Sequence, residues 1–138
     1  MNYVEQDSYG MYAVSGSNGP GPRLMGAETL VGNDVYNRQE EDLGDIKEIM
    51  LDVLAGRVSY AVLSYGGVFG MGEKLFAVPW EALTLDTVNK RFTLDVSKDR
   101  LASAPGFDKE SWPNMSDQTW AKGIHTYYGT TPPEVGRL

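Results

Sequence analysis

The amino-acid sequence predicts a small all-β barrel domain followed by a short helical extension at the C-terminus. Its 138 residues, 41% apolar and 22% charged, have the size and composition of one globular domain with tails. Between Leu30 and Val96, short runs of β-branched and aromatic residues alternate with turn residues and show no helical periodicity. Between Asp117 and Tyr128, apolar residues recur at helical spacing instead. The strands are therefore expected before the helix.

The chain divides into predicted segments of different character. Residues 1–27 are expected to form a flexible N-terminal tail, because Ser15–Pro22 consists of Ser, Gly, Asn and Pro, which resist regular structure. Residues 28–105 are expected to form the barrel domain. Residues 106–138 form a predicted C-terminal extension that contains one amphipathic helix.

The alternating pattern within the barrel domain predicts five strands. They span Val35–Asn37, Gly44–Asp52, Val58–Tyr65, Lys74–Pro79 and Arg91–Val96. The segments Asp52–Gly56 and Asp86–Asn89 each open with an acidic turn residue and carry Gly or Asn later, which is typical of hairpin loops. Strands joined by such loops are expected to be antiparallel.

The third predicted strand is apolar on both faces. Because side chains alternate along a strand, one face carries Val58, Tyr60 and Val62, and the other carries Ala61, Leu63 and Tyr65. An open antiparallel sheet usually leaves one face to water, so this strand needs a second cover. Either the C-terminal segment or a second copy of the protein could supply it. If a second copy supplies the cover, the expected assembly is a homodimer.

Two helices are expected after the barrel. Ser97 is a predicted N-cap for a short helix through Leu101, which Pro105–Gly106 would end. The second helix covers Asp117–Tyr128 and should pack on the barrel through one apolar stripe. That stripe is formed by Trp120, Ile124, Tyr127 and Tyr128.

Composition excludes several classes of function. A formal net charge of -7 disfavours direct binding to DNA or RNA, because such binding depends on basic side chains. The chain has no cysteine, which excludes disulfides, thiolate metal sites and cysteine nucleophiles. The start of the chain, Met1–Ser8, has neither the basic residues nor the apolar stretch of a secretory signal, so a cytoplasmic protein is expected. No apolar run approaches the about 20 residues of a membrane helix, so no membrane span is expected.

The glycine-rich segment Gly66–Lys74 invites comparison with a phosphate-binding loop. A Walker loop needs Gly directly before Lys, whereas Glu73 intervenes here, and the segment leads into a strand rather than a helix. We therefore expect no cofactor and interpret the segment as a wide hairpin. Val68, Phe69 and Met71 would lie at its tip as an exposed contact patch.

No set of residues predicts catalysis or metal binding. Ser64 lies in a sequence that resembles the Gly-x-Ser-x-Gly elbow, but Val62 replaces the first glycine, and His125 is the only histidine available to it. The acidic residues between Glu40 and Asp52 lack the spacing of a calcium loop. We interpret them as a solvated loop and strand edge, with no catalytic or metal-binding residue expected.

Trp80 follows Pro79, which cannot donate to a strand ladder, so the strand ends there or becomes an edge. Phe76 and Val78 share a face with Trp80. A corner of the core is favoured over a ligand-binding site for these large side chains.

Several segments taken together resemble the PRC-barrel family. They are Gly56–Gly67, Gly70–Trp80, Ala104–Asp108 and Trp112–Pro113. The likeness runs from Gly21 to Gly129 and is closest to bacterial stand-alone members with an aromatic C-terminal extension. It implies a six-stranded barrel, as in the cytoplasmic part of the photosynthetic reaction centre H subunit and the C-terminal part of a ribosome-maturation factor. In those settings the barrel is an adaptor that contacts other proteins, and no catalytic residue can be carried over.

The predicted function is a non-enzymatic protein-binding or adaptor module that forms a homodimer. Its predicted contact residues are Tyr65, Val68, Phe69, Met71 and Trp80. The alternative is a barrel that responds to a small ligand or ion, with Tyr65, Trp80 and the glycine amides lining the site. The residues alone leave both hypotheses open.

Overall fold

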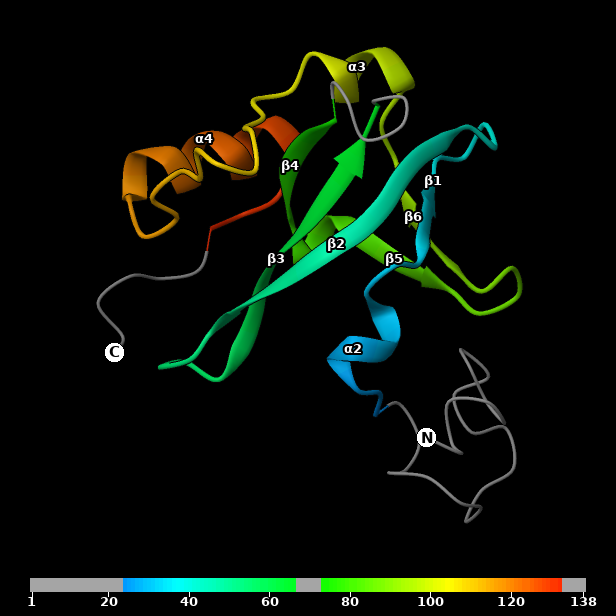
Figure 1. Cartoon of the computed structure of the whole chain (residues 1–138), viewed down its shortest axis with the longest axis horizontal. Helices are drawn as coiled ribbons and strands as arrows, with labels where there is room; N and C mark the ends of the chain where they lie inside the picture. Colours follow the sequence, from blue (N-terminus) through cyan, green and yellow to red (C-terminus); the bar gives the residue numbers. More distant parts are fainter. Residues whose placement is uncertain (1–23, 67–72, 133–138) are drawn as a thin grey trace.

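The computed structural model describes residues 24–66 and 73–132 of the chain (Figure 1). Its centre is a strongly curled sheet of six strands in the order β4-β3-β2-β1-β6-β5. The strands are β1 (Asp34–Tyr36), β2 (Asp42–Asp52), β3 (Arg57–Tyr65), β4 (Lys74–Pro79), β5 (Leu83–Asp86) and β6 (Arg91–Leu94). All neighbouring pairs are antiparallel except β1 and β6, which run parallel.

All five predicted strands are present, with ends that differ by no more than two residues from the prediction. The prediction was wrong in omitting β5, a short strand that pairs with β6 from Leu83↔Leu94 to Asp86↔Arg91. The two predicted hairpin loops do join antiparallel strands, β2 with β3 and β5 with β6, whereas β1 meets β6 in parallel at Val35↔Phe92, which was not predicted. This pairing makes the sheet mixed.

Short helices connect and cover the strands. They are α2 (Ala27–Leu30), the 3-10 turn η1 (Trp80–Ala82), α3 (Lys98–Ala102) and α4 (Gln118–Tyr128). The Ser97 side chain accepts a hydrogen bond from the Arg100 N–H at 3.0 Å, which confirms the predicted cap of α3. Asp117 caps α4 in the same way, and Gly129 ends that helix with a φ of 75°.

The observed architecture is therefore a curled six-stranded sheet against which two helices from the C-terminal part of the chain, α3 and α4, are packed. Among the described residues, no strand pairing joins β4 to β5 at the two ends of the sheet order, and η1 connects them along the chain. Because α3 and α4 are integral to the packing, "all-β" is too narrow a description of the fold.

The main core fills the inside of the curl. Its buried side chains are Val35, Leu43, Ile46, Ala61, Leu63, Phe76, Val78, Phe92, Leu94, Leu101 and Ala104. Trp80 packs against this cluster with its ring centroid 5.7 Å from that of Phe92. The interpretation of Trp80 as a corner of the core is confirmed.

The outer face of β3 is covered by the chain's own C-terminal helix. Tyr60 and Ala77 form a second buried cluster with Ile124 of α4. The rings of Tyr60 and Trp120 meet edge to face at 5.4 Å. Figure 1 shows α4 alongside β4. The second cover that β3 required therefore comes from within the same chain.

Candidate interaction site

The hairpin formed by β2 and β3 is longer than the strands beside it. β2 has 11 residues and β3 has 9, whereas β1 has only 3. β1 therefore pairs with the first part of β2 alone, from Tyr36↔Asp42 to Asp34↔Asp45. Figure 1 shows the far end of the hairpin projecting beyond the rest of the sheet.

The projecting end carries large apolar side chains in contact with water. Leu51 is 56% exposed, Val53 is 82% exposed and Leu54 is 74% exposed. Single exposed apolar residues are ordinary, but a cluster of neighbours at one turn is a feature of interaction sites. We call this cluster of Leu51, Val53 and Leu54 the hairpin tip.

Hydrogen bonds hold the hairpin tip in one conformation. Asp52 Oδ1 accepts from the N–H groups of Leu54 at 3.1 Å and Ala55 at 3.0 Å. The Gly56 N–H donates to the Asp52 carbonyl at 2.8 Å, and Gly56 adopts a φ of 75° that favours glycine. The exposed apolar side chains are thus presented by an ordered turn, as the acidic turn residue predicted.

One edge of β2 is open beyond its pairing with β1. The last contacts on that side are the Gly32 N–H to the Ile46 carbonyl at 2.6 Å and the Ile46 N–H to the Asn33 carbonyl at 2.9 Å. Within residues 24–66 and 73–132, no strand pairs with residues 47–52 on the side opposite β3. We call this stretch the open edge.

Negative charge gathers where the open edge begins. Asp34 and Asp45 are direct partners across β1 and β2. Burial raises the pKa of Asp45 above its usual value, and the charges of Asp34 and Glu73 raise it further, while Lys47 opposes them. No group of side chains able to hold a metal ion is found in the described part of the chain. The strand therefore begins its unpaired stretch beside a poorly compensated carboxylate.

The PRC-barrel family model matches residues 22–101, more than half of the chain and all six strands. The chain belongs to the PRC-barrel family. The match confirms the resemblance carried by the glycine-rich and Pro79–Trp80 segments. A search of the curated proteins found no match. Among the described residues, the PRC-barrel protein has no helix with the length and apolar character needed to cross a membrane.

Ser64 and His125 of the PRC-barrel chain have different hydrogen-bond partners. The Ser64 hydroxyl donates to Glu73 Oε2 across the β3–β4 pair. His125 Nδ1 lies 2.7 Å from the Thr130 hydroxyl oxygen. His125 is 2% exposed, and its burial lowers its pKa below the usual value. The imidazole is therefore neutral at pH 7 and packs beside Tyr60 rather than beside Ser64.

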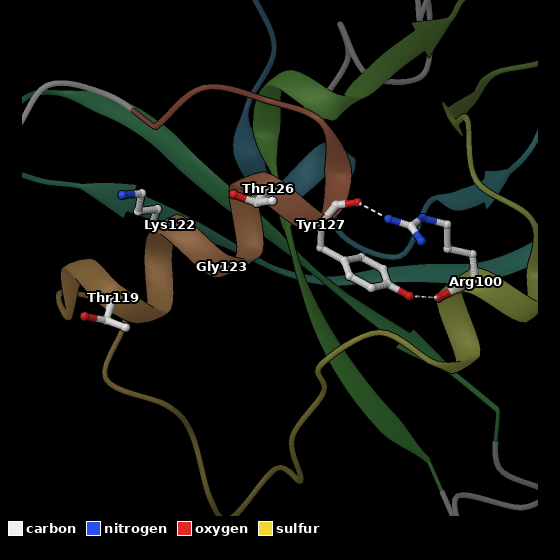
Figure 2. A pocket seen from close by; sticks show the side chains of 6 residues that line it. All are labelled: Arg100, Thr119, Lys122, Gly123, Thr126 and Tyr127. Atoms are coloured by element: carbon white, nitrogen blue, oxygen red, sulfur yellow. Dashed lines mark hydrogen bonds between the residues drawn. The ribbon is translucent and has the colours of Figure 1, made fainter.

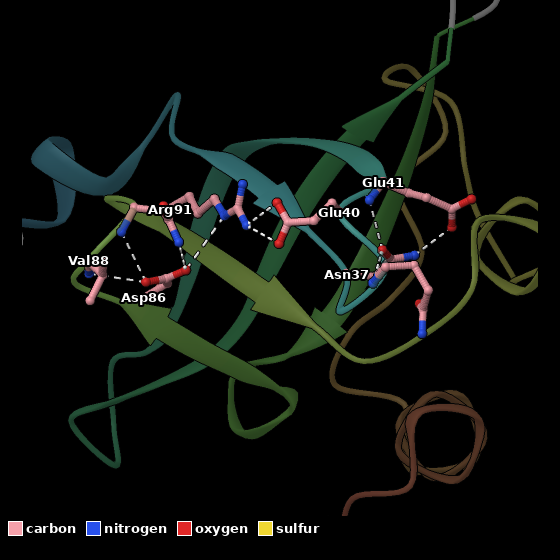
Figure 3. A network of polar contacts seen from close by, with 8 residues as sticks. Asn37, Glu40, Glu41, Asp86, Val88 and Arg91 are labelled. Carbon is pink, nitrogen blue, oxygen red and sulfur yellow. Dashed lines mark hydrogen bonds and ion pairs between the residues drawn. The ribbon is translucent and has the colours of Figure 1, made fainter.

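A polar network ties the β1–β2 connection of the PRC-barrel domain to β6 (Figure 3). Buried Asn37 accepts from the N–H groups of Gln39 and Glu41 and donates to the Val96 carbonyl. Arg91 of β6 donates to both carboxylate oxygens of Glu40, at 2.7 and 2.8 Å. Glu40 is exposed, as predicted for a solvated loop, and both Glu40 and Glu41 also have defined partners in Arg91 and Asn37.

A groove of about 500 Å³ lies between α3 and α4, open to solvent (Figure 2). Its lining residues are Arg100, Thr119, Lys122, Gly123, Thr126 and Tyr127. Arg100 donates to the Tyr127 carbonyl at 2.7 Å, and the Tyr127 hydroxyl donates to the Arg100 carbonyl at 2.6 Å. The guanidinium also lies 4.1 Å from the centre of the Tyr127 ring. These reciprocal contacts join the two helices.

The predicted contact residues do not form one described surface. Tyr65 and Trp80 are partly buried against the main core. Val68, Phe69 and Met71 lie outside the described residues. The hairpin tip was not among the predicted contacts, although the signal was present: three large apolar residues occur within four positions of a turn, where polar residues normally predominate.

Proposed function

We propose that this PRC-barrel domain is a non-enzymatic protein-binding module with an adaptor role, and that it contacts partners through the hairpin tip. The observation that carries the proposal is the exposure of Leu51, Val53 and Leu54 on an ordered turn. A pre-organised apolar cluster loses little conformational entropy on binding and gains from removing apolar surface from water.

The environment of the polar residues supports a binding role. The Ser64 hydroxyl donates a hydrogen bond to the carboxylate of Glu73, just before β4, while His125 of α4 is hydrogen-bonded to Thr130 beyond the end of its own helix. A serine activated by histidine needs that histidine within hydrogen-bond reach, and Ser64 and His125 each have a different partner. Contacts through Phe69 and Met71, and self-association, stay predictions of the same proposal.

Affinity capture from the source cells with matched variants tests the proposal. Val53→Lys places a charge on the hairpin tip, and Val88→Lys places the same charge on the β5–β6 turn, where Val88 is 85% exposed. Both turns are held by an aspartate, Asp52 or Asp86, that accepts two backbone N–H groups. The two substitutions are therefore closely matched.

We expect the wild-type and Val88→Lys proteins to capture the same partner and the Val53→Lys protein to lose it. Sedimentation velocity of the purified chain at several concentrations detects a second copy as that partner. If neither capture nor sedimentation reveals any associated protein, the proposed function is wrong. If Val53→Lys captures the partner as well as wild type does, the module binds through another surface.

A further inference from the structure

The open edge and the hairpin tip are continuous along β2. Residues 47–52 have β3 on one side, and in the described part of the chain no strand lies on the other. Leu51 belongs to this stretch and to the exposed cluster at once. An unpaired strand edge presents backbone N–H and C=O groups that can pair with another extended chain.

The sheet protects this edge against such pairing only in part. Natural proteins protect exposed edges with proline, charged side chains, bulges or very short strands. β2 contains no proline and is the longest strand of the sheet. Its sequence Ile49-Met50-Leu51 is apolar at the centre of the unpaired stretch. Two register shifts, at Ile46/Glu48 and Met50/Leu51, and the exposed charges of Lys47 and Glu48 restrict pairing, so the edge suits a short segment of matching charge rather than general sheet growth.

The charge beside the edge indicates what kind of chain would bind. Asp34 and Asp45 face each other across β1 and β2, and like charges placed directly opposite are destabilising. Glu48 adds a third, exposed carboxylate to the same strand. Lys47 is the nearby cation, and its Nζ lies 3.8 Å from Glu73. A positive side chain on an added strand would relieve the repulsion.

We propose that the open edge binds an extended segment of a partner protein by strand addition, and that this segment carries lysine or arginine at the end nearest Asp45 and apolar side chains against the hairpin tip. The proposal rests on the protein-binding function proposed above. Main-chain hydrogen bonds would supply affinity, and alternate side chains would supply specificity.

A second copy of this chain fits the open edge less well. Pairing of β2 with itself would bring the carboxylates of Asp45, Glu48 and Asp52 from both copies to one seam. Each copy also has a formal net charge of -7. Long-range repulsion between two acidic copies disfavours that encounter, whereas a basic segment is attracted.

Synthetic peptides of about eight residues, within the usual range of strand lengths, are the probes. One peptide alternates valine with lysine, and a second alternates valine with glutamate. A third has the first sequence with alternate backbone nitrogens methylated, so that it cannot donate hydrogen bonds from them. Each is titrated to about 1 mM, the range of weak specific binding, into the full-length 15N-labelled protein, while amide shifts and hydrogen exchange are recorded.

We expect the valine–lysine peptide to shift the amides of residues 47–52 and to slow their hydrogen exchange. The valine–glutamate and methylated peptides should bind at least about tenfold more weakly, since each loses one source of binding free energy. Asp45→Asn should weaken binding of the valine–lysine peptide about two- to fivefold by removing one charge pair. Val53→Lys should weaken it as well, and Val88→Lys should leave it unchanged.

Strand addition is overturned if no amide of residues 47–52 responds, or if the methylated peptide binds as well as its parent. The charge preference is overturned if the valine–glutamate peptide binds equally well. The failure of this inference is distinguishable from that of the proposed function. Capture of a partner that depends on Val53, without any peptide response at the open edge, keeps the protein-binding function and removes strand addition alone.

Discussion

Asp45 carries a charge that the folded chain does not favour. Burial, followed by repulsion from Asp34, raises the pKa of its carboxyl group. Folding therefore stabilises the protonated form relative to the ionised form, and ionised Asp45 reduces stability at neutral pH. Replacement by asparagine keeps the shape and removes the charge. We expect Asp45→Asn to raise the free energy of unfolding by about 0.2–1 kcal/mol in urea denaturation at pH 7.

The pH dependence of Asp45→Asn provides an internal check. Because the folded pKa lies above the usual value of 3.8, wild-type Asp45 becomes protonated in the folded state first as pH falls. The advantage of the variant should therefore shrink at acidic pH. Glu48→Gln on the same strand is the control, since its side chain is exposed and should change stability little. A less stable Asp45→Asn protein at pH 7 contradicts the electrostatic argument.

The contribution of His125 to stability should depend on pH in the opposite direction to that of Asp45. Burial lowers its pKa, while Glu81 acts weakly in the other direction. The unfolded chain then binds a proton near the usual value of 6.5 before the folded chain does, so the His125 contribution to stability falls as pH decreases below that value. The chain has a single histidine, so its imidazole resonance in an NMR titration is unambiguous. A measured pKa at or above 6.5 would show that burial does not control this group.

At the scale of elements, Asn37 is the residue that holds the β1–β2 connection in place. Its side chain makes hydrogen bonds to Gln39, Glu41 and Val96, which lie on two different segments. Asn37→Ala leaves those backbone groups without their partner, and we expect a loss of about 1–3 kcal/mol in the free energy of unfolding. Denaturation of Asn89→Ala is the comparison, because Asn89 is exposed and bonds only within its own turn. Equal losses in the two variants would contradict a special role for Asn37.

The strands and helices show which features of the fold local sequence patterns can predict. Alternation and turn residues located β2, β3 and β4. The Ser97 cap located the start of α3, and the apolar stripe located α4, because these signals act within a few residues. β5 was missed because it directly follows the η1 turn at Trp80–Ala82, which contains none of the Gly, Pro, Asn or Asp residues that mark a turn. The parallel pairing of β1 with β6 joins residues more than fifty positions apart, such as Val35 and Phe92. No local signal in the sequence specifies such a pairing.

The candidate site was predictable only in part. The ordered turn at Asp52–Gly56 followed from its residue types, and the hydrogen bonds of Asp52 agree with it. The open edge did not follow, because it depends on where β1 ends relative to β2 in the folded sheet. Both apolar faces of β3 were recognised, but whether α4 or a second copy covered them required the three-dimensional packing.

At the scale of the whole molecule, α4 closes the second core and removes one reason for the chain to self-associate. Ile124 is 2% exposed and packs with Tyr60 and Ala77. An aspartate at position 124 would be an unpaired buried charge, which is costly enough to displace the helix. We predict that Ile124→Asp exposes the apolar face of β3 and increases self-association and binding of a hydrophobic dye.

Sedimentation velocity and dye fluorescence at matched concentrations measure that change. Lys122→Asp is the control, because it places the same acidic side chain on an exposed position of the same helix, with a larger change in net charge. Deletion of residues 117–138 removes the cover entirely and should reproduce the effect of Ile124→Asp. If the truncated chain keeps its fold and the same association state as wild type, without dye binding, then α4 is not the cover that the sheet requires. Self-association of the intact chain would then have to arise at another surface, because the apolar face of β3 would be stable in contact with water.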